Sequence, residues 1–350
     1  MAGVEIHEYS GDFEDVAELT RRVWIPEYAG LTWVPIPDAS FLQWMFEPNT
    51  GALCPAAYDG SKIVGTVFSL SRSLRVGSTV YPVSLYTGFT VDPEYRRMAL
   101  PLVERLRRDN EERKVAFGIG MVLDSPTSIS YRFWTKYAQS FPQNFRFIFE
   151  GGYWSKFLAP RVMARAGVQA WERVAARTIG PLVQFTPHGY DPHVRPYRTA
   201  DLERCVQLLD KAYAGYEWAM IWDPKRLATQ LQHPEYQTFV FERDGIVQGM
   251  VNCHCASLQG RELIRVGMLD LWAEGDLNLS ERVRLVSHLC TDQRERGVHA
   301  LIALRAAMTP SAALVANLFL PHPQRFRIGI FLTPRTVPLS PPKTWSFEIT

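Results

Sequence analysis

The chain has 350 residues, of which 47% are hydrophobic and 21% are charged. This length exceeds what a single hydrophobic core usually serves, so we expect two domains. Its 38 basic and 36 acidic side chains leave a formal charge of +2. That balance excludes the strong positive field of a general nucleic-acid-binding protein.

The sequence also lacks the patterns that direct a chain into or through a membrane. No apolar run approaches the roughly 20 residues that span a bilayer, and the first residues show no basic-then-apolar secretory pattern. The five cysteines are odd in number and favour reduced thiols over a disulfide framework. We therefore expect a cytoplasmic protein with no membrane span.

Hydrophobic patterns and turn signals predict an alternation of strands and helices in the first half. In chain order these are a strand, two helices, three antiparallel strands, a helix, a strand, a helix and two closing strands: Val4–Tyr9, Phe13–Val23, Asp38–Phe46, Cys54–Asp59, Ile63–Ser71, Thr79–Val91, Pro101–Arg113, Val115–Leu123, Thr127–Tyr137, Phe145–Phe149 and Tyr153–Phe157. A connecting helix is expected to follow and to end at Gly180.

The second half repeats the first. An Asp-Gly turn between two strands occurs at Gly60 and again at Gly245, an offset of 185 residues, and Asp109 matches Asp292 at an offset of 183. Near-constant spacing indicates an internal duplication. We predict a domain at residues 1–160, a connecting helix or linker at 161–191 and a second domain at 192–350.

A strand-to-helix turn in the first half, GFTVDPEYRRMALPLVERLRRDN, is suited to binding an anion. Asp92-Pro93 ends the strand, two arginines follow, and Pro101 lies in the first turn of the next helix. A helix start offers free N–H groups and a favourable dipole. With Arg96 and Arg97 beside it, this turn can hold a diphosphate; the alternative is a solvated arginine pair before a surface helix.

The order of elements, together with VDPEYRRMAL, resembles the GNAT acyltransferase superfamily. The segment is similar to that family's pyrophosphate loop, Arg/Gln-x-x-Gly-x-Gly/Ala, with Arg96 in the first position, Ala99 in the fourth and Pro101 in the sixth. Ala99 replaces a glycine, which requires a negative φ, and Pro101 lacks a backbone donor. The resemblance implies an α/β (α+β) fold of two tandem GNAT-like domains, each a mixed, mostly antiparallel sheet flanked by helices with a splayed central strand pair.

The same resemblance implies N-acyl transfer from a pantetheine thioester to a primary amine of a small molecule or peptide. The donor is acyl-CoA or a phosphopantetheine-linked acyl carrier protein, consumed as a substrate, and no metal is implied. The positions that match the family's donor site are Phe89, Thr90, Val91, Arg96, Arg97, Met98, Ala99 and Leu100.

The resemblance also points to catalytic groups. The family's usual proton donor is a tyrosine on the helix after the splayed strand, where this chain places Trp134, with Tyr131 and Tyr137 about one helical turn to either side. Asp124, at the end of the splayed strand, is a candidate to accept the proton of the amine. The alternatives are that the tyrosines only pack the helix onto the sheet and that Asp124 caps that helix.

In such folds the first helix pair shapes the acceptor site. The candidate substrate-binding residues there are Trp24, Glu27, Tyr28, Trp33 and Trp44. Glu27 is placed to meet a cationic amine, whereas the tryptophans could equally be core aromatics.

The second half has no arginine pair at the matching turn and carries Glu274 and Asp276 instead. Two carboxylates would repel a diphosphate, so we expect a degenerate, non-catalytic domain. The segment Cys253-His254-Cys255 is not expected to bind a metal, because alternate strand residues face opposite sides. Two other functions stay open: a non-catalytic GNAT-like binding or scaffold protein, and a thioester decarboxylase or hydrolase on the same fold.

Overall fold

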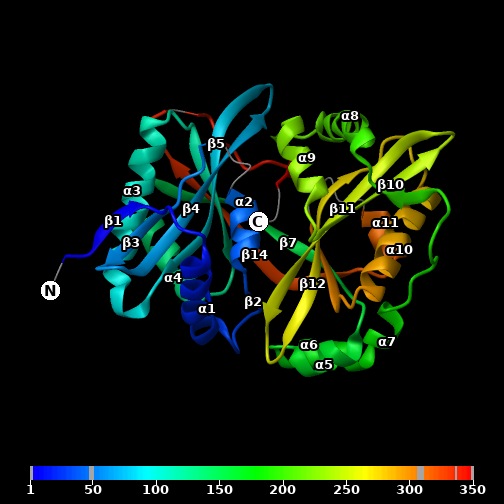
Figure 1. Ribbon diagram of the computed structural model, residues 1–350, viewed down its shortest axis with the longest axis horizontal. Helices are drawn as coiled ribbons and strands as arrows, with labels where there is room; N and C mark the ends of the chain where they lie inside the picture. The colour runs from blue at the N-terminus through cyan, green and yellow to red at the C-terminus, as the bar shows by residue number, and fades with distance from the viewer. Residues whose placement is uncertain (1–2, 47–50, 306–310, 336, 348–350) are drawn as a thin grey trace. The chain divides into compact units, whose positions relative to one another are not determined.

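The computed structural model describes residues 3–46, 51–305, 311–335 and 337–347 (Figure 1). The chain forms two compact units. The first unit contains residues 1–150 and 325–342, and the second contains residues 151–324 and 343–349. No helix among the described residues is long and apolar enough to cross a membrane.

The first unit is built on the strand order β1-β3-β4-β5-β6, with β5 and β6 parallel and the other neighbours antiparallel. Its strands are β1 (Glu5–Glu8), β2 (Val34–Pro35), β3 (Pro55–Asp59), β4 (Lys62–Val76), β5 (Thr79–Val91) and β6 (Phe117–Leu123). Its helices are α1 (Glu14–Tyr28), α2 (Ala39–Phe46), the 3₁₀ helix η1 (Pro93–Met98), α3 (Ala99–Glu112) and α4 (Ile129–Ser140).

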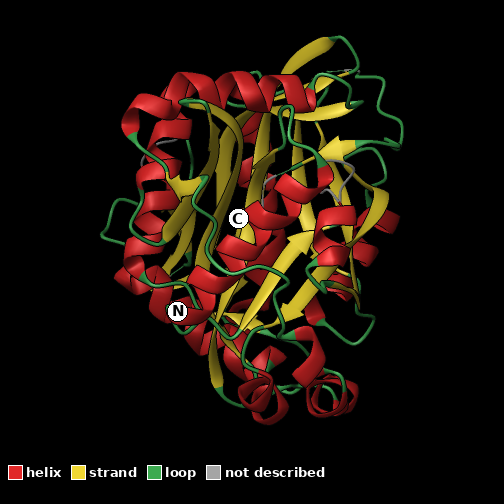
Figure 2. Cartoon of the chain, turned by 90° about the vertical axis from the view of Figure 1, so that its right-hand side faces the viewer, coloured by secondary structure: helices red, strands yellow, loops and turns green. Residues whose placement is uncertain are grey.

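The second unit repeats this architecture with the order β8-β10-β11-β12-β13, in which only β12 and β13 are parallel. Its strands are β8 (Val194–Pro196), β9 (Trp218–Ile221), β10 (Tyr236–Arg243), β11 (Ile246–Gln259), β12 (Leu263–Ala273), β13 (Ala300–Leu304) and β15 (Trp345–Ser346). Its helices are the 3₁₀ helix η2 (Thr199–Asp201), α8 (Leu202–Tyr213), α9 (Pro224–Gln232), α10 (Leu279–Glu295) and α11 (Ser311–Ala316). Helices lie on both faces of the strands (Figure 2).

Two long strands, β7 (Phe145–Phe157) and β14 (Leu320–Leu332), each contribute to both units. In the first unit, β6 pairs with Phe326–Leu332 of β14. In the second unit, β13 pairs with Tyr153–Phe157 of β7. The strand beside β6 therefore comes from the second half of the sequence, and the strand beside β13 comes from the first half.

The core of each unit follows from the amphipathic helices. Leu102 and Leu106 of α3 are buried against Ala57, Val64 and Val67 of the first sheet. Burying one such side chain contributes about 1.5–3 kcal/mol. The core of the second unit gathers around α10 in the same way.

The segment after β7 differs from the single connecting helix that the sequence predicts. It forms three short helices, α5 (Pro160–Ala166), α6 (Ala170–Thr178) and α7 (Gly180–Val183). Gly167 is extended, with φ −54° and ψ 130°, and this breaks the helix after Ala166. The helical backbone then continues past Gly180, because Pro181 lies in the first turn of α7, where a missing N–H costs nothing.

Candidate functional site

Strands β5 and β6 separate partway along their length, as the sequence resemblance predicts. They pair in parallel from Val83↔Phe117 to Tyr86↔Gly120, and β6 then continues to Leu123 beside β14. From Gly88 to Val91, within the described residues 79–123, β5 pairs with no residue of β6. This edge of β5 can accept an extended ligand as an added strand, which is how pantetheine is expected to bind.

A β-bulge lies at the same point on β5. Its register with β4 passes from Thr66↔Thr90 to Phe68↔Thr87, so that two residues of β5, Gly88 and Phe89, lie opposite Val67 alone. Gly88 has φ +63°, and a Cβ there would lie 2.5 Å from the ring of Phe68. Only glycine meets both conditions. The bulge changes the direction of the backbone at the point where β5 separates from β6.

Aromatic side chains pack beneath this separation. Phe89 contacts Phe133 and Trp134 at ring-centroid distances of 5.5 and 5.4 Å. Trp134, which stands at the family's tyrosine position, is buried and packs edge-on against Phe331 of β14. Trp134 is therefore part of the core of the first unit.

The predicted diphosphate turn forms the short helix η1, which leads directly into α3. Asp92 caps η1 by accepting from the Glu94 N–H at 3.1 Å, and Arg22 pairs with the same carboxylate at 3.2 Å. Ala99 has φ −57°, so an alanine fits here without strain. The next helix, α3, begins at Ala99 and has no side-chain cap at Met98. The Ala99 N–H donates to the Arg96 carbonyl, and Pro101 has no N–H, so the two arginines are the main groups here that can attract an anion.

Around this helix start, Arg96, Arg97 and Leu100 are exposed, Met98 is partly buried and Ala99 is buried. Arg96 donates to Glu27 at 2.9 Å. The arginine side chain is 58% exposed and the glutamate only 12%. The structure thus joins a predicted donor-binding residue to a predicted acceptor-binding residue.

Tyr28, next to Glu27 at the end of α1, contacts the first turn of α4. The Ser130 N–H donates to its hydroxyl, while burial and Glu27 raise the pKa of Tyr28 to about 12. At neutral pH this hydroxyl is therefore protonated. Three elements meet here: the end of α1, the diphosphate turn and the start of α4.

At the start of α4, the cap is Ser128, whose hydroxyl accepts from the Tyr131 N–H at 3.1 Å. Asp124 therefore does not cap this helix. It forms an ion pair with Arg327 of β14 at 3.0 Å, and the Arg327 guanidinium lies 5.1 Å from the centre of the Tyr131 ring. Arg327 also pairs with Glu150 at 3.2 Å. Asp124 and Tyr131 are brought together by an arginine from the second half of the sequence.

Tyr137, the other candidate acid, faces the core instead. Its hydroxyl donates to Glu104 of α3 at 2.9 Å, and its side chain is buried. Burial and this carboxylate raise the pKa of Tyr137 well above its usual value. The Tyr137 hydroxyl is therefore held by Glu104, on the side of α4 that faces α3.

The three candidate tryptophans near the N-terminus are all partly buried. Trp44 of α2 packs against Phe41 at a centroid distance of 5.6 Å. Trp24 lies on α1 and Trp33 in the segment before β2.

The second unit has the same separation and bulge but a different helix start. The pairing of β12 with β13 ends at Leu269↔Ala303, and Asp270 is the extra residue of a bulge on β12. The start of α10 is closed by a capping box, in which Asn278 accepts from the Glu281 N–H at 3.0 Å and Glu281 accepts from the Asn278 N–H at 2.9 Å. The start of α10 is thus closed by side chains, whereas α3 has no side-chain cap.

The acidic residues before α10 are also engaged. Glu274 pairs with Arg282 at 2.7 Å, and Asp276 pairs with Lys211 at 2.7 Å. Burial raises the pKa of Glu274, while Lys211 lowers that of Asp276. These ion pairs and the negative charge of the turn disfavour a diphosphate here.

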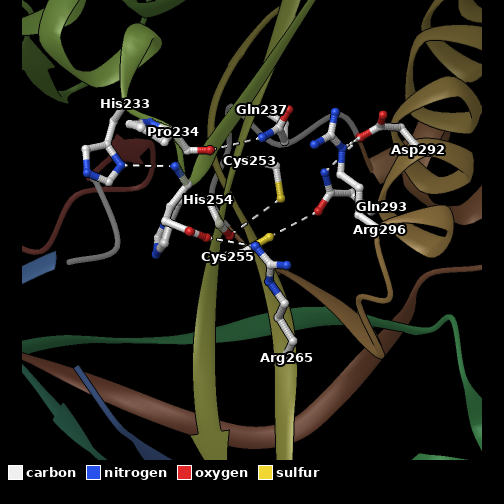
Figure 3. Close-up of polar contacts among 11 residues, drawn as sticks. His233, Pro234, Gln237, Cys253, His254, Cys255, Arg265, Asp292, Gln293 and Arg296 are labelled. Carbon is white, nitrogen blue, oxygen red and sulfur yellow. Dashed lines mark hydrogen bonds and ion pairs between the residues drawn. The ribbon is translucent and has the colours of Figure 1, made fainter. Parts of the chain in front are cut away.

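Figure 3 shows the surroundings of the Cys253-His254-Cys255 segment on β11. Both cysteines belong to the core around α10, and the Cys255 thiol contacts the Gln293 side chain at 3.3 Å. His254 pairs instead with the buried carboxylate of Asp270. Burial raises the pKa values of the Cys253 and Cys255 thiols, which keeps them protonated. Among the described residues, no group of three or more potential metal ligands occurs.

Three features of the candidate site escape sequence reasoning. Arg327 lies far along the chain from Asp124, and only the placement of β14 beside β6 joins them. Ser130 acts through its backbone, which carries no residue signal. Gly88 did carry a signal: it lies inside the predicted strand Thr79–Val91, and a glycine within a strand often marks a bulge.

The strand order, the separation of the parallel pair and the bulge occur in both units. They define an α/β protein built of two tandem GNAT-like folds, which confirms the fold predicted from the sequence. No protein-family model matches the sequence, and no curated protein matches it significantly.

Solved structures match nearly the whole chain. A Saccharomyces cerevisiae N-myristoyltransferase with bound myristoyl-CoA superposes with a TM-score of 0.74, covering 95% of this chain and 83% of that chain at 12% identity. A second structure of that enzyme, with myristoyl-CoA and inhibitors, has a TM-score of 0.74 and covers 95% and 80% at 11% identity. A conserved Enterococcus faecalis protein of unknown function, a probable N-acyltransferase, has a TM-score of 0.57 and covers 95% and 74% at 10% identity. At these identities the likeness establishes the fold.

Proposed function

We propose that this protein is an N-acyltransferase that moves an acyl group from acyl-CoA to a primary amine of a small molecule or peptide. The observation that carries the proposal is the separation of β5 from β6, followed along the chain by two exposed arginines before the start of α3. The edge of β5 can bind pantetheine, and the arginines before α3 can bind a diphosphate. These two segments follow one another along the chain. The two N-myristoyltransferase structures hold myristoyl-CoA, which supports a long-chain acyl-CoA as donor.

The donor would lie along Phe89, Thr90 and Val91, with its diphosphate at Arg96–Leu100. Arginine side chains and helix N–H groups both bind phosphate oxygens well. Pro101 removes one backbone donor from the first turn of α3, so the arginines carry more of the binding. A carrier protein, which presents a single phosphodiester, is the alternative donor.

In the reaction the amine nitrogen attacks the thioester carbonyl. A C–N bond forms, the C–S bond breaks, one proton leaves the nitrogen and the departing thiolate takes up a proton. We assign the first transfer to Asp124, which directly follows the separated strand β6, and the second to Tyr131 in the first turn of α4. Arg327 is a positioning residue, since it contacts both side chains. Arg327→Gln should shift the pH profile of kcat, whereas Arg325→Gln should leave it unchanged.

We assign Glu27 to the acceptor, with Tyr28 beside it. A carboxylate that is 88% buried on its side chain is expensive to leave without a cation. Arg96 fills that role here, and an ammonium group can replace it once the diphosphate draws Arg96 away. The second unit, with its capped helix α10 and acidic turn, would be non-catalytic.

The test is a transfer assay on the full chain with acyl-CoAs of graded length, matched acyl carrier proteins and a panel of amines. Release of free thiol and mass spectrometry of the product would be followed together. Arg96→Ala should weaken CoA binding about ten-fold, and the effect should shrink as salt rises. Arg108→Ala is the matched control, because Arg108 is an exposed arginine on the body of α3.

Other results would favour the other functions. Thiol release that needs no amine would indicate a hydrolase or, with loss of CO₂, a decarboxylase. Donor binding without any thiol release would indicate a binding or scaffold protein. Equal effects of Arg96→Ala and Arg108→Ala would show that the diphosphate assignment is wrong.

A further inference from the structure

The helices α6 and α7 of the second unit present two apolar faces. One face is buried in the unit, through Ala176, Gly180 and Val183. The opposite face carries Trp171, Val174, Leu182 and Phe185, which are 40%, 57%, 72% and 62% exposed. We call these four residues the apolar stripe. A surface helix normally turns polar residues to water, so a second apolar face indicates a partner.

The stripe forms a continuous line along the helical backbone. Its members follow Trp171 at i+3, i+11 and i+14, spacings that return to the same side of a helix. Ile179, between the two helices, is 40% exposed and has φ −94° and ψ −18°, so the chain stays in the right-handed helical region where α6 gives way to α7.

The ends of the stripe are held firmly. The Trp171 ring packs edge-on against His322 at 5.3 Å. At the other end, the buried Lys156 donates to the carbonyls of Val183 and Phe185 at 2.5 and 2.7 Å. The stripe is therefore a fixed part of the second unit, and its exposure does not come from a loose tail.

The charge around the stripe is mainly positive. Residues 160–187, all of them described, contain four arginines and one acidic residue, Glu172, which is 5% exposed. Arg161, Arg165 and Arg177 are exposed. Arg165 pairs with Glu262 at 3.3 Å, so Arg161 and Arg177 are the cations on which the rim depends. The visible rim of the stripe is thus basic, and α5, α6 and α7 lie together in the second unit (Figure 1).

We propose that α5–α7 dock the protein on an anionic lipid surface, with the apolar stripe inserted among the acyl chains. An apolar face with aromatic ends and a basic rim is the composition of a helix that lies in a membrane interface. A protein partner would also cover apolar groups, but it would not favour a rim of arginines alone. Anionic lipid headgroups meet both needs together. The proposal does not depend on the acyl transfer assigned to the first unit.

The test is sedimentation of the full chain with vesicles of phosphatidylcholine alone and of phosphatidylcholine with 30 mol% phosphatidylglycerol. The wild-type chain should bind the anionic vesicles, and binding should weaken as salt rises. The double variant Leu182→Ser/Phe185→Ser should lower the partition coefficient at least about ten-fold. The matched control is Leu263→Ser, because Leu263 is also exposed in the second unit, at 57%.

A second arm tests the charges. Arg161→Gln/Arg177→Gln should weaken binding by about five-fold for each arginine removed. The control Arg108→Gln/Lys225→Gln removes two exposed cations from other helices and should have little effect. Brominated lipids should quench the wild-type fluorescence more than that of Trp171→Phe.

Three results would overturn the proposal. The first is no binding of the wild-type chain to anionic vesicles. The second is that Leu182→Ser/Phe185→Ser binds anionic vesicles as well as the wild-type chain does, while its melting temperature is unchanged. The third is a wild-type dimer, seen by light scattering, that Leu182→Ser/Phe185→Ser converts to monomer without any change in vesicle binding, because the stripe would then join two copies of the chain.

Discussion

Among single side chains, the pairing of Arg96 with Glu27 has the clearest consequence for ligand binding. The mostly buried carboxylate holds a guanidinium that a diphosphate would also attract. In the proposed reaction the diphosphate of the donor therefore attracts Arg96, and the ammonium group of the acceptor attracts Glu27. Binding of the donor should free Glu27 for the amine.

Glu27→Gln should accordingly have effects of opposite sign on the two substrates. Removing the carboxylate frees Arg96, so CoA should bind about two- to five-fold more tightly. The amine loses its counter-ion, so its KM should rise. Calorimetry with CoA and steady-state kinetics with the amine measure the two separately. Weaker binding of both ligands would instead indicate that the variant disturbs the end of α1.

The two tyrosines of α4 should separate into a chemical and a structural role. Tyr131→Phe should lower kcat and leave donor affinity unchanged, because its proton matters only as the thiolate leaves. Tyr137→Phe loses a buried hydrogen bond to Glu104 and should cost about 1–2 kcal/mol of stability. Thermal unfolding and turnover should be measured on both. If only Tyr137→Phe lowers kcat, then Tyr137 is the proton donor and Tyr131 has the structural role.

His322 should make the second unit sensitive to acid. Burial lowers the pKa of His322 to about 4, whereas an unfolded histidine titrates near 6.5. Between these values the unfolded chain binds the proton and the folded chain does not, so stability falls as the pH falls from about 6.5 to 4. A difference of about 2.5 pKa units corresponds to a loss of about 3 kcal/mol. His322→Gln should flatten this part of a plot of melting temperature against pH; an unchanged slope would contradict the assignment.

At the level of elements, the bulge in β5 is the feature on which the donor site depends. It places Gly88 at φ +63° with its α-carbon close to the Phe68 ring. The bulge and the separation from β6 occur within three residues of each other. A change in local backbone angles should therefore act on both stability and turnover.

Gly88→Ala should cost about 1–2 kcal/mol for the left-handed backbone alone, and more because its Cβ meets Phe68. Turnover should fall further than stability, since the backbone beside the thioester shifts. Gly77→Ala is a matched control: it has φ +59°, and nothing lies within 4 Å of its Cβ position. If the two variants lose equal stability and keep equal turnover, the bulge has no part in catalysis.

Much of this element order could be predicted from the sequence, because the signals are local. The Asp-Gly turns at Gly60 and Gly245 do adopt positive φ, at +61° and +75°, and the strand between Thr79 and Val91 has the predicted bounds. The number of helices at 160–183 could not be predicted in the same way. The breaks fall at Gly167, which has ψ 130°, and at Ile179, which has φ −94° and ψ −18°; an isoleucine carries no local signal for a helix end.

The residues of the candidate site also fall into two groups, those that a local motif predicts and those that only the fold brings in. Arg96, Arg97 and Ala99 follow from a short motif, and the structure places them where η1 runs into the start of α3. The contact of Arg327 with Asp124 follows from strand exchange, for which no local pattern exists. The sequence similarity between the halves even conceals this strand exchange, because the similarity suggests that each half completes its own sheet.

On the scale of the whole molecule, the exchange of β7 and β14 means that a half of the sequence is not a half of the structure. Strand β6 of the first unit pairs from Phe117 to Leu123 with a segment of β14 that lies near the end of the chain. Without this segment β6 would expose a long apolar edge, and such edges favour aggregation. The aromatic core would also lose Phe331, which packs on Tyr86, Trp134 and Phe145.

A fragment of residues 1–160 should therefore fail to fold as a stable unit, although the sequence places a domain boundary there. A second fragment, in which residues 1–150 are joined by a flexible linker to 325–342, restores the β14 segment and should unfold cooperatively. The same joined fragment with Phe331→Ala should lose about 3–5 kcal/mol, because a large buried side chain is removed. Circular dichroism, thermal unfolding and light scattering compare the three. Cooperative unfolding of residues 1–160 alone would show that the exchanged strand is dispensable, and that Arg327 is not needed to complete the first unit.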